Sequence, residues 1–232
     1  MYVVLYAAII LIFAICLVPM SSGFFSGLGL VLAVVAVILI LKRNMDIKTS
    51  MKSYNDDSLI IQNVREGGVF KLANVDGYDS DLELKVIGRN LYIEGDYSWY
   101  ELECIRPDGE KVWVDVDDDD TLKVSVVLEK LRLAQIKLSN SLEEIDEEES
   151  GNAVYRGITH YYADSGEAVF YKHCDDKKTE KLYYWDFKCS TGNYLVSVEK
   201  WKSENGRDDM QIYYSQIIRP AAITVYSTHK EG

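Results

Sequence analysis

Four consecutive aspartates at residues 117–120 are the first place in the sequence where side chains could do chemistry, as a calcium site. A calcium loop of the EF-hand type needs Gly at its sixth position and Glu at its twelfth. Counted from Asp115, these positions hold Asp120 and Val126. The run therefore favours a solvent-exposed acidic loop, with a weak cation site as the alternative.

The three histidines are the next candidates, for acid–base catalysis or metal binding. His173 is followed by Cys174 and Asp175, but neighbouring residues of a strand point to opposite faces, so these side chains do not easily meet. His160 and His229 have no evident partner in the sequence. Known catalytic motifs and phosphate-binding glycine loops are absent. We expect no catalytic residue, no metal and no cofactor, which makes an enzyme the least favoured class.

Aromatic side chains are the remaining candidates for binding. A sheet face that carries aromatic rings and carboxylates can bind a peptide or a cationic ligand, whereas the same rings can also simply pack in a core. The candidate contacts for a partner or ligand are Trp99, Trp113, Tyr161, Tyr183, Trp185 and Trp201.

Alternating strands must position these side chains. From residue 82 onward apolar and polar residues alternate with a period of two, as in residues 82–86 and 112–116, and turn signals such as Pro107-Asp108-Gly109 separate the runs. This pattern is typical of half-buried antiparallel strands. Residues 59–64 could form a first strand, and residues 129–138 fit a strand or a short helix equally well.

An internal repeat divides these strands into two sets. WYELEC at residues 99–104 matches YWDFKC at 184–189, and the alternating strands VWVDV at 112–116 and YLVSV at 194–198 follow them in the same order. The matching Cys and aromatic positions favour a tandem duplication of a small antiparallel unit. The alternative is that meandering sheets resemble one another by pattern alone.

The repeat predicts a domain organisation. We expect a first antiparallel β unit at residues 59–141, an acidic linker at 142–152 that is either exposed coil or a fraying helix, and a second unit at 153–228. Neither unit could bury enough apolar surface alone, so the two are expected to pack together.

Residues 1–41 predict a membrane anchor because they contain no Asp, Glu, Lys or Arg. The stretch is about twice the ~20 apolar residues that one membrane span needs. Pro19 and the small residues after it break it into two helices, Tyr2–Pro19 and Phe24–Leu41. The expected fold class is a membrane-anchored all-β protein, with a transmembrane hairpin at residues 1–43, a linker at 44–58 and the two β units.

Basic residues set the expected orientation of this hairpin. None precedes or separates the spans, whereas Lys42 and Arg43 follow the second span directly. The positive-inside rule then places both termini in the cytoplasm of a bacterium, in a multi-pass protein of the inner membrane.

Composition excludes several classes of partner. The chain has 37 acidic and 25 basic residues and a formal net charge of −12, which repels nucleic acids. None of its four cysteines belongs to a C-x-x-C pair, so neither a disulfide framework nor a zinc site is expected.

Several segments together resemble a known family. YRGITHYY, GEAVFY, KLYYWDF and YLVSVEKW resemble the second half of the bacterial domain-of-unknown-function-4178 family, and WYELEC and VWVDVDDDD resemble its first half. The resemblance covers residues 67–226. It implies no activity, since none is established for the family. It does imply a membrane-associated partner, because family members are often linked to membranes and envelope-stress components.

The leading functional hypothesis is a non-enzymatic scaffold, anchored to the membrane and linked to bacterial envelope processes. It would bind the bilayer and another membrane or cytoplasmic protein, with self-association through the hairpin as a further option. The alternative is a sensor that binds a small or basic ligand between the two β units. A deep pocket lined by acids and aromatic rings would favour the sensor, and a flat aromatic patch or a bare sheet edge would favour the scaffold.

Overall fold

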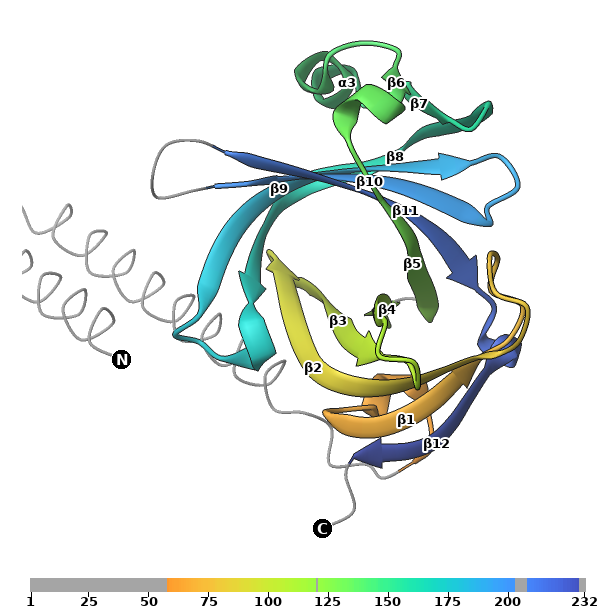
Figure 1. The fold of residues 1–232 in the computed structure, drawn as a ribbon. Coiled ribbons are helices and arrows are strands. Elements are labelled where there is room, and N and C mark those ends of the chain that lie inside the picture. The colour runs from red at the N-terminus through yellow and green to blue at the C-terminus, as the bar shows by residue number, and fades with distance from the viewer. Residues whose placement is uncertain (1–57, 120, 203–207, 230–232) are drawn as a thin grey trace, which may run out of the picture. The chain divides into compact units, whose positions relative to one another are not determined.

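Twelve strands and one α-helix form the part of the chain that the computed structural model describes, residues 58–119, 121–202 and 208–229 (Figure 1). In chain order the elements are η1 (Ile61–Asn63), β1 (Gly67–Leu72), β2 (Leu82–Glu94), β3 (Tyr97–Ile105), β4 (Lys111–Asp117), β5 (Lys123–Leu131), η2 (Leu133–Gln135), β6 (Lys137–Leu138), α3 (Leu142–Glu148), β7 (Asn152–Tyr155), β8 (Ile158–Tyr171), η3 (Lys172–Cys174), β9 (Thr179–Cys189), β10 (Tyr194–Trp201), β11 (Asp209–Ile218), η4 (Pro220–Ala222) and β12 (Ile223–His229).

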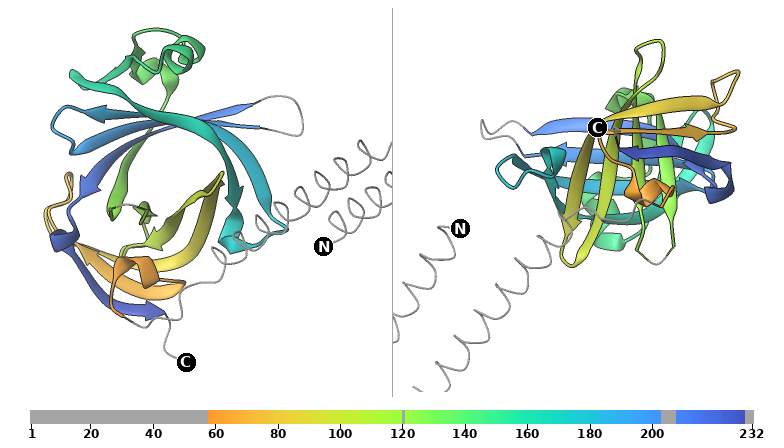
Figure 2. Two further views of the ribbon diagram at one scale, coloured as in Figure 1. Left: turned by 180° about the vertical axis from the view of Figure 1, so that it is seen from behind. Right: turned by 90° about the horizontal axis from the view of Figure 1, so that it is seen from below.

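All twelve strands belong to a single antiparallel sheet, in the order β12-β1-β2-β3-β4-β5-β11-β10-β9-β8-β7-β6. An additional pairing between β2 and β8 closes the eight central strands into a ring, which Figures 1 and 2 show from three sides. In this ring β3 lies opposite β10, and β4 lies opposite β9. Closure therefore turns the inner faces of the strands toward one another.

The two longest strands, β2 and β8, make this closure possible. The first residues of β2 pair with β1, whereas Leu91–Ile93 pair with β8. In the same way the first residues of β8 pair with β7, and its last residues pair with β2. Each strand has a register shift between the two segments that pair with different neighbours. The shift lies at Val86/Gly88 in β2 and at Tyr162/Asp164 in β8, and such bulges bend a strand.

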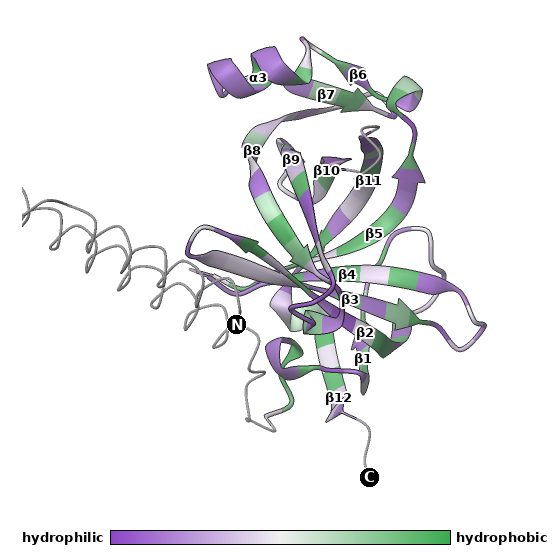
Figure 3. Cartoon of the chain, turned by 90° about the vertical axis from the view of Figure 1, so that its left-hand side faces the viewer, coloured by the Kyte–Doolittle hydropathy of each residue, from purple (hydrophilic) through white to green (hydrophobic). Residues whose placement is uncertain are grey.

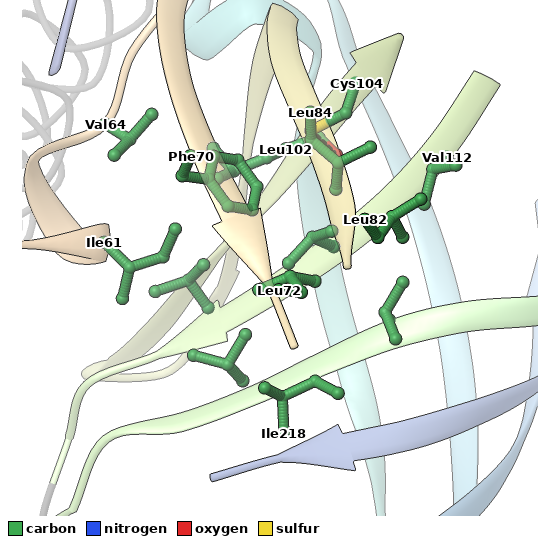
Figure 4. Close-up of a cluster of buried hydrophobic side chains, with 14 of the residues drawn as sticks. Ile61, Val64, Phe70, Leu72, Leu82, Leu84, Leu102, Cys104, Val112 and Ile218 are labelled. Atoms are coloured by element: carbon green, nitrogen blue, oxygen red, sulfur yellow. Dashed lines mark hydrogen bonds between the residues drawn. The ribbon is translucent and has the colours of Figure 1, made fainter. Parts of the chain in front are cut away.

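Two apolar cores lie on the faces of the sheet that point away from the ring interior. The first core joins β1 and η1 to one face of β2–β5, and Figure 4 shows Phe70 of β1 beside Leu102 of β3. The second core joins α3 and β7 to one face of β9–β11, around Phe187 and Ile145, which are both fully buried. Burial of this area stabilises each half by the hydrophobic effect.

Residues between these core positions face the ring interior, and many of them are acidic or aromatic. Leu102 and Cys104 belong to the first core, whereas Glu101 and Trp99 on the same strand line internal cavities. Figure 3 shows the resulting mixture of hydrophobic and hydrophilic residues along the strands. The all-β prediction is confirmed, but its polar positions do not all face solvent.

The strands of both predicted β units belong to the one sheet. The matched segments occupy corresponding strands, since WYELEC lies in β3 and YWDFKC in β9, while VWVDV lies in β4 and YLVSV in β10. Of the two alternatives for the acidic linker at residues 142–152, coil or helix, the structure contains the helix α3, whose Ser141 cap accepts a hydrogen bond from the Glu144 backbone.

Two local expectations also differ from the structure. Residues 59–64 contain the short helix η1 in place of a strand, because Asn63 and Val64 close 3₁₀-type turns. Residues 129–138 are neither one strand nor one helix: they contain the end of β5, then η2, then β6.

The predicted membrane-anchored fold class is corrected by the structure. No helix in the described part of the chain is long and apolar enough to cross a membrane. The spans Tyr2–Pro19 and Phe24–Leu41 lie outside the described residues. The supported fold class is a mostly antiparallel β structure with one α-helix, and the multi-pass inner-membrane location is not retained.

Gly68 is expected to be essential for the contact between β1 and β12. A Cβ atom at this position would lie 2.8 Å from the Thr228 carbonyl oxygen and 2.9 Å from that of Ser227. Because these are backbone atoms, they cannot rotate away, and Gly68→Ala should lower the free energy of unfolding by about 1–3 kcal/mol. Chemical denaturation measures this. Ser80→Ala, at an exposed position outside the strands, is the control, and an equal or larger loss there would refute the packing argument.

Candidate functional site

The first candidate site is a cavity of about 310 Å³ inside the ring, between the two halves of the sheet. Its volume is at the low end of the range typical of small-molecule sites, about 300–1,000 Å³. Its walls carry aromatic rings and carboxylates from both halves. They include Tyr92, Tyr97, Trp99, Asp115, Asp117, Ser125, Asp164, Tyr184, Asp186, Ser197 and Glu199.

A second cavity, of about 320 Å³, adjoins the first because Tyr92 lines both. It too lies between the halves and combines aromatic rings with charged groups. Its walls include Tyr78, Glu101, Trp113, Glu129, Lys130, Phe170, Trp201, Gln211 and Tyr213.

Four carboxylates from opposite walls of the ring are central to the candidate site: Asp115, Asp186 and Glu199 line the first cavity, and Glu101 lines the second. Glu101 of β3 and Glu199 of β10 come from opposite strands, and so do Asp115 of β4 and Asp186 of β9. Repulsion across the ring is one cause of the raised pKa values of Glu199 and Asp186, in each case from the carboxylate opposite. Closure of the sheet therefore brings together groups that are far apart in the sequence.

Each carboxylate is held by a neutral hydrogen-bond donor. The Ser125 hydroxyl donates to Asp115 over 3.0 Å, and the Ser197 hydroxyl donates to Asp186 over 2.6 Å. The side-chain amide of Asn90 donates to Glu101 over 2.8 Å, and the Trp201 indole donates to Glu199 over 2.9 Å. These bonds orient the carboxylates but leave their charge uncompensated.

None of the ion pairs among the described residues includes one of these four carboxylates. Burial raises the pKa of Asp115 and of Asp186 to about 7, with repulsion from a neighbouring carboxylate adding to each shift. Burial also raises the pKa of Glu101, and it raises that of Glu199 well above its usual value. Without a counter-charge such a cluster keeps protons near neutral pH.

The aromatic rings form a continuous stack around the boundary between the cavities. Tyr92 stacks on Trp99 with ring centroids 5.0 Å apart and an interplanar angle of 8°. Trp201 meets the edge of Tyr92 at 6.5 Å, and Tyr184 meets Trp99 at 5.7 Å. The Tyr184 hydroxyl donates to Glu94 at the end of β2 over 2.6 Å, which ties the stack to the β2–β8 closure.

This arrangement suits an organic cation better than a metal ion. Among the described residues, no three His, Cys, Asp or Glu side chains are grouped so that they could hold a metal. Rings beside carboxylates attract an ammonium group through the ring quadrupole and through charge. An alkyl chain attached to that ammonium would contact the ring faces.

The structure brings three of the six predicted contact residues to the cavities and leaves three elsewhere. Trp99 lines the first cavity, and Trp113 and Trp201 line the second. The other three line neither cavity: Tyr161 is 55% exposed on β8, Tyr183 donates to Asp146 of α3, and Trp185 is 5% exposed in the second core.

The four inner carboxylates were missed from the sequence because polar strand positions were assigned to solvent. One signal could have found two of them: Glu101 and Asp186 occupy the same position in the matched segments WYELEC and YWDFKC. A position that faces only solvent tolerates many polar residues. An acidic residue at the same position of both segments therefore indicates a specific environment.

The histidines and cysteines do not form a catalytic group in the described residues. His160 is fully buried, where burial lowers its pKa, and its Nδ1 contacts the Ile158 carbonyl at 3.1 Å. The Cys174 thiol donates to the Arg89 carbonyl, and His173 packs against Gly88. None of His160, His173 and Cys174 lines either cavity.

Comparison with known proteins supports the family resemblance. A family model described as Domain of unknown function (DUF4178) matches residues 82–220, which is more than half of the chain and includes both inner faces of the ring. No curated protein and no solved structure matches the chain. On this evidence the chain belongs to the DUF4178 family.

Proposed function

We propose that this protein is a binding module for a small organic cation, held between the two halves of the closed sheet. One observation carries the proposal: four partly buried carboxylates line an interior that also carries aromatic rings, and no lysine or arginine forms an ion pair with any of them among the described residues. Buried charges are costly unless paired. A cationic ligand would supply the missing charge.

Two lysines, Lys123 and Lys188, also line the first cavity. Lys123 pairs with Asp117 at 3.0 Å, and the Lys188 side chain is exposed. In the second cavity the Lys130 ammonium donates to Gln211 and lies 5.5 Å from the centroid of the Tyr213 ring. The Lys123–Asp117 ion pair and the Lys130–Gln211 hydrogen bond thus use acceptors other than the four inner carboxylates.

A scaffold that holds a partner protein stays a prediction. The edge at which an extended peptide could add a strand is β12, which ends the sheet order next to β1. Addition of a strand at β12 would not involve the interior carboxylates. Binding of a ligand in the interior would involve them, and for this reason it is the better-supported function.

Calorimetry with a matched pair of ligands tests the proposal on the full-length protein at pH 8, where Asp115 and Asp186 are mostly ionised. Hexylamine and 1-hexanol share a chain and differ in charge. A charged hydrogen bond contributes about 1.5–3 kcal/mol, so the amine should bind about 10–100-fold more tightly. Equal binding of the two ligands, or binding of neither, would refute the proposal.

Variants locate the site in the same experiment. Asp186→Asn keeps the shape of the side chain and its bond to Ser197 while it removes one charge, so amine affinity should fall about 10-fold. Glu147→Gln removes an exposed charge of α3 that lines neither cavity, and its affinity should match that of the unaltered protein.

A further inference from the structure

The two cavities share one wall. Tyr92 lines both, and its hydroxyl bonds to Glu101, so the same side chain reaches from the first cavity to a carboxylate of the second. A ligand confined to the first cavity could pair with Asp115, Asp186 or Glu199. It would leave Glu101 without a partner charge.

Carboxylates stand on both sides of this shared wall. Asp115, Asp186 and Glu199 line the first cavity, whereas Glu101 lines the second. Glu101 and Asp115 are neighbours in the β3–β4 register, so the acidic surface continues from one cavity to the other. A single ammonium group can pair with only part of this surface, because its charge is localised on one nitrogen.

The rings between the carboxylates are apolar on their faces. Tyr92 stacks on Trp99 toward the first cavity, and Phe170 and Trp201 contact it on the side of the second. Methylene groups gain free energy by contact with such faces. Carboxylates in both cavities beside the aromatic faces of Tyr92 and its neighbours are thus complementary to ammonium groups joined by methylene segments.

We infer that the ligand is a linear polyamine with at least two ammonium groups, one paired with Asp186 and Glu199 in the first cavity and another with Glu101 in the second. This inference rests on the proposed binding of an organic cation and adds the number of its charges and the cavity that takes each. The chain between the ammonium groups passes Tyr92. The ligand is thereby distinguished from a compact monocation, which would occupy the first cavity alone.

A series of ligands with increasing charge tests the inference on the full-length protein at pH 8. Hexylamine carries one ammonium, 1,6-diaminohexane carries two on the same chain, and spermidine carries three. If the second cavity takes an ammonium, the diamine should bind about 10–100-fold more tightly than hexylamine, as expected for one added charged hydrogen bond. Spermidine should bind at least as tightly as the diamine.

Two variants assign the charges to the cavities. Glu101→Gln should remove the advantage of the diamine over hexylamine and leave hexylamine affinity within about twofold, whereas Asp186→Asn should weaken both ligands about 10-fold. Glu199→Gln provides a second first-cavity variant if Asp186→Asn does not fold. Thermal unfolding of each variant checks its fold before binding is measured.

The outcomes separate the inference from the function on which it rests. If no amine binds, or if hexanol binds as well as hexylamine, the proposed function fails. If hexylamine binds in preference to hexanol while the diamine is no tighter, or while Glu101→Gln weakens hexylamine and diamine equally, binding of an organic cation stands and the polyamine inference is overturned.

Discussion

The Asp115→Asn/Asp186→Asn double variant is expected to reduce the pH dependence of stability in the ligand-free protein and to be more stable than the unaltered protein at pH 8. The folded-state pKa of each aspartate is about 7, above the unfolded value of about 3.9. Below pH 4 both states hold the proton, and the groups have no effect on stability. Between pH 4 and pH 7 the folded state holds protons that the unfolded state releases, so stability falls as pH rises.

The expected size of this effect is large. A difference of about three pKa units corresponds to at most about 4 kcal/mol for one group. The two aspartates interact, so we expect the Asp115→Asn/Asp186→Asn double variant to gain about 2–4 kcal/mol over the unaltered protein at pH 8 and little at pH 4. Denaturation by urea at each pH measures the difference.

Comparison at the same pH isolates the aspartates from other titrating groups. His160 has the opposite effect on the pH dependence of stability. Burial lowers its pKa in the folded state, so as pH falls the unfolded chain takes up the proton first and the free energy of unfolding decreases. This contribution is common to both proteins and cancels. The control is Asp96→Asn/Asp176→Asn, which makes the same chemical change at two exposed turn positions. A gain in stability that is equal at pH 4 and pH 8 would contradict the burial argument.

Phe187→Ala is expected to destabilise the whole sheet by about 3–5 kcal/mol, the usual cost of a large buried aromatic truncated to alanine. Phe187 is fully buried in the second core, and its ring meets that of Tyr162 edge-on at 6.5 Å. Truncation removes this packing and leaves a cavity beneath α3 and β7.

The shape of the unfolding curve is the informative part of this prediction. Because β5 pairs with β11 and β2 pairs with β8, the two cores share one hydrogen-bonded sheet. Phe187→Ala in the second core and Phe70→Ala in the first should therefore each shift a single cooperative transition, followed by circular dichroism and by tryptophan fluorescence. Two separate transitions, of which each variant shifts only one, would show that the halves unfold independently.

Local patterns in the sequence predicted much of the local structure. Alternation with a period of two predicted β2 from Leu82 and β4 from Val112, because a half-buried strand needs one apolar face. Pro107-Asp108-Gly109 predicted the turn between β3 and β4, where Gly109 has a φ of 90° that glycine adopts without strain. The prediction failed at residues 59–64, where an apolar run formed η1, because a short apolar run does not distinguish a strand from a helical turn.

Alternation could not show what each polar face meets. The same sequence pattern arises whether Glu101 points to water or to the inner face of another strand, since the pattern records only that the opposite side of the strand is apolar. Trp185, predicted as a contact residue, was assigned to a binding face for the related reason that aromatic rings occupy both cores and sites. The distinction requires knowledge of which strands lie opposite one another.

By itself, the sequence determined the β character of the chain from residue 82, turns such as Pro107-Asp108-Gly109, its acidic charge and its family. Only the tertiary structure decided that β2 pairs with β8, and this closure depends on register shifts within two long strands whose paired residues are about 80 positions apart in the chain. Such pairing is selected by the packing of the entire sheet, which no local window of sequence contains. Closure in turn placed Glu101 opposite Glu199 and Asp115 opposite Asp186, and it thereby formed the candidate site.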